Sequence, residues 1–476
     1  MTDLLIKGGT ILTMDADRKI IPDGAVAVEG SIIKHVGDKA GVSSAKKVID
    51  ATGKLVMPGF VNSHTHVIQL LLRGGLSQDK ELYDWLFNVL YPGLASYSPD
   101  DARLGTSVYV SEALRAGITT IVDNEDQGRT DAVAVATIGT YARTGIRAVY
   151  ARMFFDHSPE HMSKLIETVL RKGVTVKHTT DLIETCDQAL AHIESLMDRF
   201  HGTENGRIQV WPAPSLPNIC SEEGLIRSSE LAEKRNTMVT THLAEAPFDA
   251  NMYGMTSTEF LNCLGVLRPS LLAAHCVWMT DRDIRLLQVN DVKVAHNAVS
   301  NLYLASGIAP ISKMVAQGIT VGVSTDDANC NESVNMIQAM KIAALAQRAK
   351  NLDCSALTSE KVVEMATIDA ARAVGMQDSI GSLEKGKKAD IIIIDLAHPQ
   401  LCPLHHIPNA LVFQAYGSEV DTTIVDGKVL MENRSLTYMS REEELQLYRD
   451  AQKASVAIAK RAGLPGLDRP WTRLGR

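Results

Sequence analysis

The chain has 476 residues, of which 45% are hydrophobic, and a formal net charge of −8. Length alone suggests two or three domains, although α/β barrels often exceed the usual domain size as one unit. The acidic balance argues against nucleic-acid and membrane partners, because both require a basic surface. The seven cysteines are scattered and form no C-x-x-C pair, which indicates a reducing compartment rather than a disulfide framework. We recognise no leader peptide and no apolar stretch of membrane-spanning length, and therefore expect a cytoplasmic protein.

Both ends of the sequence are predicted to form short strands. Near the N-terminus, apolar runs bounded by glycine occur at residues 4–7, 10–14, 25–30 and 32–37. Near the C-terminus, similar runs occur at residues 389–395 and 423–430. We therefore expect residues 1–56 and 376–476 to form one composite β-sandwich domain with a C-terminal tail.

The middle of the chain alternates apolar strands with helical stretches. The predicted strands cover residues 61–66, 118–123, 146–151, 208–212, 238–241, 271–274, 292–296 and 320–325. Two helix starts are marked by Ser98 with Pro99, and by a capping pair, Thr280 with Asp283. Eight alternating strand–helix units predict a parallel sheet closed into a distorted (β/α)8 TIM barrel over residues 57–375.

An ordered set of possible metal ligands lies at the ends of four of these strands. They are His64, His66, His242, His275 and Asp326. Residues i and i+2 of a strand share a face, so His64 and His66 can present two imidazoles to one ion. A lone histidine is more often packed or exposed than a ligand, but the ordered series at strand ends favours a metal site. Imidazoles and a carboxylate suit one divalent transition metal, Zn²⁺ or Fe²⁺, that activates a bound water.

Three carboxylates near these strand ends are candidates for acid–base chemistry. Glu245 follows His242 by three residues and suits protonation of a ring nitrogen, although it is alternatively a solvated loop carboxylate. Asp326 is a candidate ligand and also a base for the attacking water. Asp327 adjoins it, and one of two such close carboxylates can hold a proton for a leaving group. The alternative for Asp327 is a charge at a helix N-terminus.

Other residues are candidates for contact with the substrate. His296 ends the strand between those of His275 and Asp326, and either lines the pocket or packs. Cys330 contacts the leaving group or is an inert buried thiol. Trp85 and Leu86 form an apolar wall for a flat ring or belong to a core helix.

Several segments resemble the amidohydrolase superfamily, and more narrowly its branch with one metal, which holds adenosine, cytosine and guanine deaminases. The segments that carry this resemblance are residues 58–66, 242–245, 274–276 and 324–326. Further segments are similar to the s-triazine hydrolases of that branch, at residues 83–88, 151–156, 210–214, 332–336 and 412–417. The resemblance spans nearly the whole chain. It implies a substrate pocket that includes Gln69, Leu82, Met153 and Trp85, and a homo-oligomer.

The s-triazine hydrolases divide into chlorohydrolases, which act on rings such as atrazine, and deaminases, which act on rings such as melamine. The deaminases carry Leu, Asp and Cys where the chlorohydrolases carry Phe, Asn and Ser. This sequence has Leu82, Asp327 and Cys330, the deaminase set. An amine is a poor leaving group that needs a proton, which Asp327 can supply. His296, where the triazine enzymes are expected to carry Gln, instead matches the broader deaminase pattern.

We therefore expect a metal-dependent hydrolase that releases ammonia from an aminated N-heterocycle, an s-triazine such as melamine, by attack of metal-bound hydroxide. His64, His66, His242 and Asp326 hold the metal, and His275 either binds it or orients the hydroxide. Glu245, His275, Asp326 and Asp327 are the expected catalytic residues. The alternatives are dechlorination of a chloro-s-triazine and deamination of a purine or pyrimidine base such as guanine or cytosine. Retention of every ligand and of Glu245 disfavours a non-catalytic scaffold.

Overall fold

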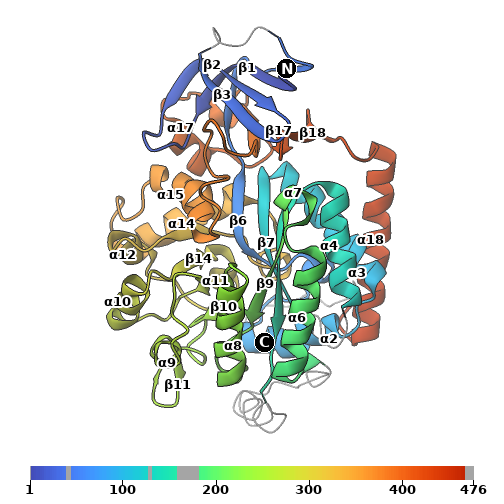
Figure 1. Cartoon of the computed structure of the whole chain (residues 1–476), viewed down its shortest axis with the longest axis vertical. Helices are drawn as coiled ribbons and strands as arrows, with labels where there is room; N and C mark the ends of the chain where they lie inside the picture. The colour runs from blue at the N-terminus through green and yellow to red at the C-terminus, as the bar shows by residue number, and fades with distance from the viewer. Residues whose placement is uncertain (1, 39–43, 127–130, 158–181, 467–476) are drawn as a thin grey trace, which may run out of the picture.

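The computed structural model describes residues 2–38, 44–126, 131–157 and 182–466. Figure 1 shows the first and last strands gathered at one end of the molecule and alternating strands and helices below them. The last ten residues of the predicted C-terminal tail, 467–476, lie outside the described residues.

Strands from both ends of the chain pair in one nine-stranded sheet. Its members are β1 (Leu4–Leu12), β2 (Ile20–Glu29), β3 (Ile32–Asp38), β4 (Lys47–Asp50), β5 (Lys54–Pro58), β16 (Ile391–Asp395), β17 (Val420–Val425), β18 (Lys428–Glu432) and β19 (Ser435–Leu436). Their order is β19-β18-β17-β16-β5-β1-β2-β3, with β4 also paired to β1. The two ends meet where β5 pairs with β16 in antiparallel register. The two packed layers of the predicted sandwich stay a prediction.

Two predicted strand boundaries in this sheet are wrong. Residues 4–7 and 10–14 were expected as separate strands, but β1 runs through Gly8 and Gly9 with shifts of register there. The shifts are β-bulges, which Gly8 permits through its positive φ of 86°. Residues 423–430 do not form one strand, because the chain reverses at Asp426 and Gly427 between β17 and β18. Both residues have positive φ, as a tight Asp-Gly hairpin turn requires.

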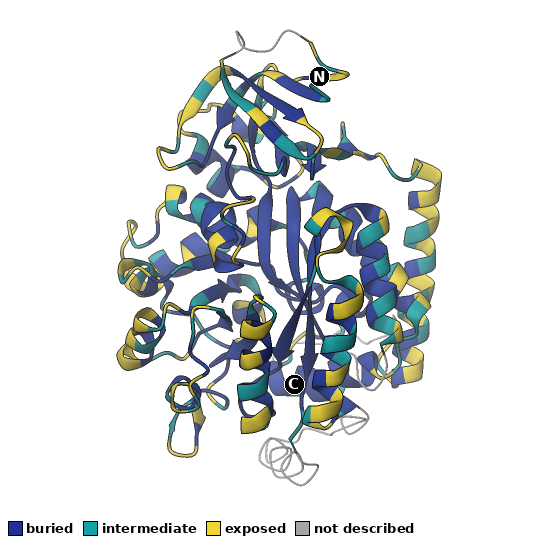
Figure 2. Ribbon diagram, in the orientation of Figure 1, coloured by how far each residue is buried: buried dark blue, intermediate teal, exposed yellow. Residues whose placement is uncertain are grey.

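The middle of the described chain holds two parallel sheets of four strands each. The first contains β6 (Phe60–Thr65), β7 (Ile118–Asp126), β8 (Arg147–Phe154) and β9 (Ile208–Pro214), in that order. The second contains β10 (Val239–Leu243), β13 (Leu271–His275), β14 (Lys293–His296) and β15 (Val321–Val323), in that order. Every residue of β6, β8, β10 and β13 is buried, and Figure 2 shows the strands as a buried centre inside helices with exposed outer faces. Such continuous burial is typical of parallel strands covered on both sides.

Backbone hydrogen bonds join the two parallel sheets at both of their borders. The N–H of His242 in β10 donates to the carbonyl of Ser215, next to β9, at 3.0 Å. At the other border, the N–H of Asp326, beyond β15, donates to the carbonyl of His64 in β6 at 3.1 Å. Three of these four residues are predicted metal ligands, and the fourth, Ser215, contacts His242. The sheets therefore meet at the site.

Helices follow most of the parallel strands and precede the last strands of the chain. The described helices are η2 (Ile68–Leu72), α1 (Leu82–Trp85), η3 (Leu86–Leu90), α2 (Tyr91–Leu94), α3 (Pro99–Arg115), α4 (Ala132–Thr144), α6 (Cys186–Phe200), α7 (Thr203–Gly206), α8 (Glu222–Lys234), α9 (Ser257–Cys263), α10 (Asp281–Val289), α11 (Ala298–Tyr303), α12 (Ile311–Ala316), α13 (Ala328–Asn331), α14 (Met336–Asn351), α15 (Ser359–Ala366), α16 (Ile368–Ala373), η5 (Pro399–Leu401), α17 (Ile407–Asn409), η6 (Ala410–Gln414) and α18 (Arg441–Ala462). A short hairpin of β11 (Asn251–Met252) and β12 (Met255–Thr256) precedes α9. The predicted starts of α3 at Ser98 and of α10 at Thr280 are confirmed, each with a reciprocal capping box. Among the described helices, none is long and apolar enough to cross a bilayer.

A buried ion pair ties the terminal sheet to the first parallel sheet. Arg147, the first residue of β8, donates from Nε to Asp390 Oδ2 at 2.7 Å and from Nη2 to Asp390 Oδ1 at 3.0 Å. Asp390 directly precedes β16 and also accepts the backbone N–H of Asp426 at 2.8 Å. The side chains of Arg147 and Asp390 are 4% and 2% exposed. Losing one partner would leave the other charge buried without compensation.

Replacing Arg147 by Met should therefore destabilise the protein by about 3–5 kcal/mol, the usual cost of removing one partner of a buried pair. The measurement is urea unfolding followed by circular dichroism. The matched control is Lys47→Met, because Lys47 pairs with Glu432 at 2.7 Å on the surface of the same sheet. An exposed pair contributes only about 0–1 kcal/mol. Equal losses in the free energy of unfolding for the two variants would show that the buried Arg147 pair contributes no more than the exposed Lys47 pair.

Candidate functional site

The five predicted metal ligands are brought together at the carboxyl ends of the parallel strands. His64 lies in β6 and His66 directly beyond it, His242 lies in β10, His275 closes β13, and Asp326 lies three residues beyond β15. All five are buried. Parallel strands turn their carboxyl ends to one side, where active sites of such folds are built.

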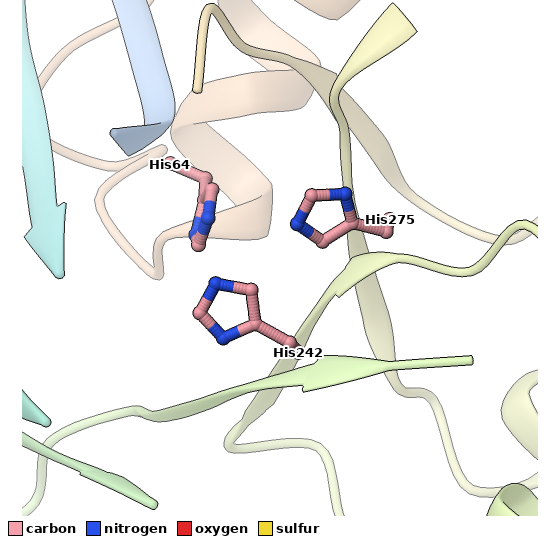
Figure 3. Close-up of side chains that lie close together, drawn as sticks. All are labelled: His64, His242 and His275. Carbon is pink, nitrogen blue, oxygen red and sulfur yellow. The ribbon is translucent and has the colours of Figure 1, made fainter. Parts of the chain in front are cut away.

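Ligand atoms of these residues fall into two overlapping groups that share His64. One group is His64, His242 and His275, and the other is His64, His66 and Asp326, with the ligand atoms of each group within 4.8 Å of one another. Figure 3 shows the imidazoles of the first group converging from separate strands toward a common space. Asp326 Oδ1 lies 3.5 Å from Nε2 of both His64 and His66. The spacing suits one ion held between the groups.

Three of the imidazoles have their Nδ1 atom occupied by an oxygen of a neighbouring segment. The pairs are His66 with the Asn124 carbonyl, His242 with the Ser215 carbonyl at 2.8 Å, and His275 with Asn301 Oδ1 at 2.8 Å. Such an oxygen can only accept, so each Nδ1 carries the proton and each Nε2 keeps its lone pair. This arrangement is typical of metal-binding histidines, whose second nitrogen is fixed by an outer contact.

His64 is the clearest sign that the site fits a metal. Neither of its ring nitrogens has a hydrogen-bond partner among the described residues, although the side chain is fully buried. A buried polar group without a partner costs free energy, and an ion would supply the missing contact.

The charges at the site also fit a divalent cation. Burial lowers the pKa of His64 to about 4 and those of His66 and His242 to about 3, so these imidazoles are neutral at pH 7. Burial by itself would raise the pKa of Asp326, but His275 and His64 hold it well below its usual range. Neutral imidazoles and an ionised carboxylate are the forms that bind metal.

Helix α11 supports His275 and Asp326 from the second sheet. Asn297 donates its amide to His275 Nε2 at 3.1 Å, and Ser324 Oγ fixes that amide by donating to its oxygen. Ser300 Oγ donates to Asp326 Oδ2 at 2.5 Å. His275 and Asp326 both have positive φ, 70° and 60°. Non-glycine residues adopt this backbone only where their surroundings hold them, and such residues concentrate at functional sites.

Strand β7 supports His66 from the first sheet through three consecutive residues. The Asp123 side chain accepts the backbone N–H of Val67 at 2.9 Å, and the Glu125 side chain accepts that of Ile68 at 2.8 Å. Between them, the Asn124 carbonyl accepts a hydrogen bond from His66 Nδ1. Sequence reasoning missed the role of these residues: Asp123 was only the last residue of the predicted strand 118–123, and Asn124 and Glu125 lie beyond it. Two acidic residues placed just beyond the apolar part of a buried strand were the available signal.

A narrow cavity of about 30 Å³ opens beside the ligands. It is lined by His66, Leu82, Trp85, Leu86, Leu90, Tyr91, Met153, Ser215, Leu216, His242, Glu245, His275 and Asp326. Of the predicted substrate contacts, Leu82, Trp85, Leu86 and Met153 are therefore at the cavity. Sequence reasoning missed Leu90, Tyr91, Ser215 and Leu216, which carry no chemical signature of their own.

Four other predicted residues are buried nearby without lining this cavity. Gln69 donates to Glu125 Oε2 at 3.3 Å, and both ring nitrogens of His296 lack a partner among the described residues. Asp327 caps the short helix α13, with Oδ1 accepting the Asn329 N–H at 2.9 Å, and Cys330 Sγ lies 3.6 Å from the Asp327 carbonyl. The N-terminal position of Asp327 thus matches the alternative for that residue, but its Oδ2 has no partner among the described residues. Contact of these four with a substrate stays a prediction.

Glu245 reaches the cavity next to His275. Its Oε2 lies 3.5 Å from His275 Nε2, and the side chain is 4% exposed. Asp249 fixes the backbone here by accepting the N–H groups of Glu245 and Ala246 at 2.8 and 2.7 Å. Burial, together with the charges of Asp326 and Asp249, raises the pKa of Glu245 well above its usual value. A carboxyl that keeps its proton near neutral pH can act as an acid.

Known proteins resemble the chain over nearly its full length. The amidohydrolase family matches residues 55–430. An S-triazine hydrolase of Gordonia rubripertincta is 40% identical over 100% of both chains, and a 5'-deoxyadenosine deaminase of Methanosarcina acetivorans is 33% identical over 96% of this chain and 100% of its own. The crystal structure of atrazine chlorohydrolase TrzN from Arthrobacter aurescens TC1 complexed with zinc superposes with a TM-score of 0.85 at 26% identity, covering 95% of this chain and 100% of that one.

The purified protein should hold about one transition-metal ion per chain, because the described residues offer one set of converging ligands. His66→Ala should lose most of that metal, since one ligand of few contributes much of the binding free energy. The measurement is elemental analysis of protein purified without chelator. His405→Ala, at an exposed histidine, is the control. Two equivalents in the wild type, or full occupancy in His66→Ala, would contradict the assignment.

Proposed function

Because the chain belongs to the amidohydrolase family and is thus a hydrolase of C–N or C–halide bonds, we propose that it deaminates aminated N-heterocycles, s-triazines such as melamine in particular. The observation that carries this proposal is that one cavity is shared by a metal-ligand set, an apolar wall and a buried acid. The wall suits a flat ring and the acid suits a ring nitrogen. The full-length similarity to an S-triazine hydrolase supports the choice of ring.

The metal is proposed to be held by Nε2 of His64, His66 and His242 and by Asp326. When bound there, zinc or ferrous iron would lower the pKa of its water and supply a nucleophile at neutral pH. We place His275 beside the ligands rather than among them, because its Nε2 already accepts the Asn297 amide. From that place His275 orients the attacking water toward the ring carbon that bears the amine, for which its Nε2 must exchange the Asn297 amide for the water.

Three carboxyl groups divide the proton transfers. Glu245 donates a proton to the ring nitrogen, which makes the adjacent carbon more electrophilic. Asp326 takes a proton from the attacking water, and this proton reaches the departing amine through Asp327, so that the amine leaves as ammonia. As the amine leaves, the ring nitrogen returns its added proton to Glu245. Asp327 Oδ2 is the atom for this step, because Oδ1 is occupied by the Asn329 N–H. Water and the amine are thereby converted to a ring hydroxyl and ammonia.

Two other reactions are supported by specific observations. Dechlorination is supported by the likeness to atrazine chlorohydrolase, but chloride needs no proton and gains little from Asp327. Deamination of a purine-like substrate is supported by His296 and by the 5'-deoxyadenosine deaminase relative. The narrow cavity favours a single small ring over a nucleoside.

We also propose that the two parallel sheets close one distorted eight-stranded barrel over residues 57–375. The hydrogen bonds at both borders of the sheets support closure. Residues 1–56 and 376–476 would then form the separate sandwich. We further propose that the protein forms a homo-oligomer and that its substrate is a small N-heterocycle.

If Glu245 is the acid, Glu245→Gln should keep its metal and fold but lose kcat by about a hundredfold or more, the usual contribution of a positioned acid. The measurements are steady-state kinetics and metal content on the same sample. The control is Glu230→Gln, at an exposed position of α8. A raised KM with normal kcat would instead make Glu245 a binding residue.

The reaction itself is tested by ammonia and chloride release from amino- and chloro-s-triazines, guanine, cytosine and 5'-deoxyadenosine. The wild type should prefer an amino-s-triazine. Asp327→Asn combined with Cys330→Ser should lower kcat/KM for the amine and raise it for the chloro analogue, each by about tenfold or more.

A wild type that prefers the chloro compound or a purine would contradict the proposed substrate. Equal losses on both triazines in the double variant would mean that Asp327 and Cys330 support the site without choosing the leaving group.

A further inference from the structure

The segment of residues 73–85, which leads into the cavity wall, is bound along its length to residues 327–334, which follow Asp326. The first segment ends in Leu82 and Trp85 of the wall. The second carries Asp327 and Cys330 of the proposed leaving-group side. The two segments are far apart in the sequence. Their relative position is therefore set by the contacts between them, which involve side chains.

Glu332 holds the beginning of the wall segment. Its Oε2 accepts the backbone N–H of Gly74 at 2.9 Å, and its Oε1 accepts that of Gly75 at 2.8 Å. All three residues have positive φ: 99° and 87° for the glycines and 61° for Glu332. A Cβ on Gly74 would meet open space, so glycine is required there by the backbone conformation and not by lack of room. That conformation points two consecutive N–H groups at one carboxylate.

Glu112 of α3 makes a second bridge between the same segments. Its Oε2 pairs with Arg73 Nη1 at 2.6 Å, and its Oε1 accepts the backbone N–H of Val334 at 2.9 Å. Arg73, Gly74, Glu112 and Glu332 also line a second cavity of about 510 Å³ between η2, α3 and α18. The Arg73 and Glu112 side chains are 28% and 31% exposed, so this end of the contact is open to solvent.

Asn329 holds the inner end of the wall segment. In the amide orientation that satisfies both of its polar atoms, Nδ2 donates to the Leu72 carbonyl at 3.0 Å and to Ser77 Oγ at 3.3 Å, and Oδ1 accepts from Trp85 Nε1 at 3.0 Å. Ser77 Oγ in turn donates to the Asn329 carbonyl. The backbone N–H of Asn329 is bound to Asp327 Oδ1. One residue thus contacts both the ring-facing tryptophan and the proposed proton donor.

We propose that Glu112, Asn329 and Glu332 form a latch that sets the position of Trp85 and Leu82 against the substrate ring, and that Asn329 and Glu332 are positioning residues for ring specificity. The inference rests on the proposed function, because it takes an aminated ring as the occupant of the cavity.

The size of the cavity explains why this position matters. A cavity of about 30 Å³ is narrow, so a small displacement of its wall changes how closely a planar ring is contacted. The opposite side of the cavity is built from strand ends and metal ligands that are fixed by the sheets. The wall segment is held instead by a few side-chain hydrogen bonds, and in the proposal the latch sets how closely the segment lies against the ring.

Removing the latch should weaken ring binding and leave the chemical step nearly intact. Asn329→Ala should raise KM for the amino-s-triazine by about tenfold and change kcat by less than about threefold, because the lost contacts act equally on the substrate and the transition state. Glu332→Ala should act in the same direction, and Glu332→Gln should restore part of the loss because its oxygen can still accept one N–H. Trp85→Phe, which removes the Nε1–H donor together with one ring of the indole, should raise KM at least as much as Asn329→Ala, and the double variant should be little worse than Trp85→Phe alone.

A second measurement needs no substrate. Limited trypsin digestion of the native protein, followed by mass analysis, reports opening of the wall segment through cleavage after Arg73 and Lys80. The latch variants should be cut at these two bonds about tenfold faster or more than the wild type, because local opening governs such cleavage. Asn262→Ala and Glu230→Gln, both at exposed positions, should leave KM and cleavage unchanged.

Wild-type KM and wild-type cleavage in Asn329→Ala and Glu332→Ala would overturn the inference. A fall in kcat at unchanged KM would also overturn it, since Asn329 would then act on the leaving-group side alone. If the wild type converts none of the aminated rings, the proposed function fails, while the cleavage rates after Arg73 and Lys80 still decide whether the latch holds the wall.

Discussion

The structure depends on two backbone hydrogen bonds that join its parallel sheets, from His242 to Ser215 and from Asp326 to His64. Each sheet has only four strands, and the residues that connect them are the ones whose side chains converge on the candidate metal site. The same peptide groups therefore serve the fold and the chemistry. Small movement of one sheet against the other would separate His64 and His66 from His242, because these ligands belong to different sheets.

Burial strongly influences the charge states of the side chains at the site. The histidines are kept neutral because the protein interior disfavours their charged forms, and Asp326 stays ionised because imidazoles surround it. Polar groups fix these ligands from two sides: the backbone carbonyls of Asn124 and Ser215 on the side of the first sheet, and the side chains of Asn301 and Ser300 in α11 on the other. A polar centre inside an apolar interior is stable only when nearly every group is paired. Among the candidate ligands, His64 is the one with no hydrogen-bond partner in the described part of the chain, which indicates a bound ion.

Much of this organisation could be predicted from the sequence, because the signals for it lie within short, continuous stretches of residues. The eight parallel strands are short segments rich in apolar and β-branched residues, and the candidate ligands stand at the ends of four of them, so composition and position sufficed. The reversal at Asp426 and Gly427 was missed because the apolar run continues on both sides of the turn. Ser215 and Asn301 could not be identified, since a carbonyl or an amide becomes meaningful only when the fold brings it to a histidine. The same holds for Asn329, whose partners Leu72, Ser77 and Trp85 are distant in sequence.

The pairing of β5 with β16 has a consequence for how the chain folds. Residues 54–58 are synthesised long before residues 391–395, yet the two strands that they form lie side by side in the terminal sheet. During synthesis, β5 therefore waits with an open, apolar edge while the whole α/β region is made. Such late, long-range pairing slows folding and exposes an aggregation-prone edge. The N-terminal strands gain this partner only after residues 391–395 have left the ribosome.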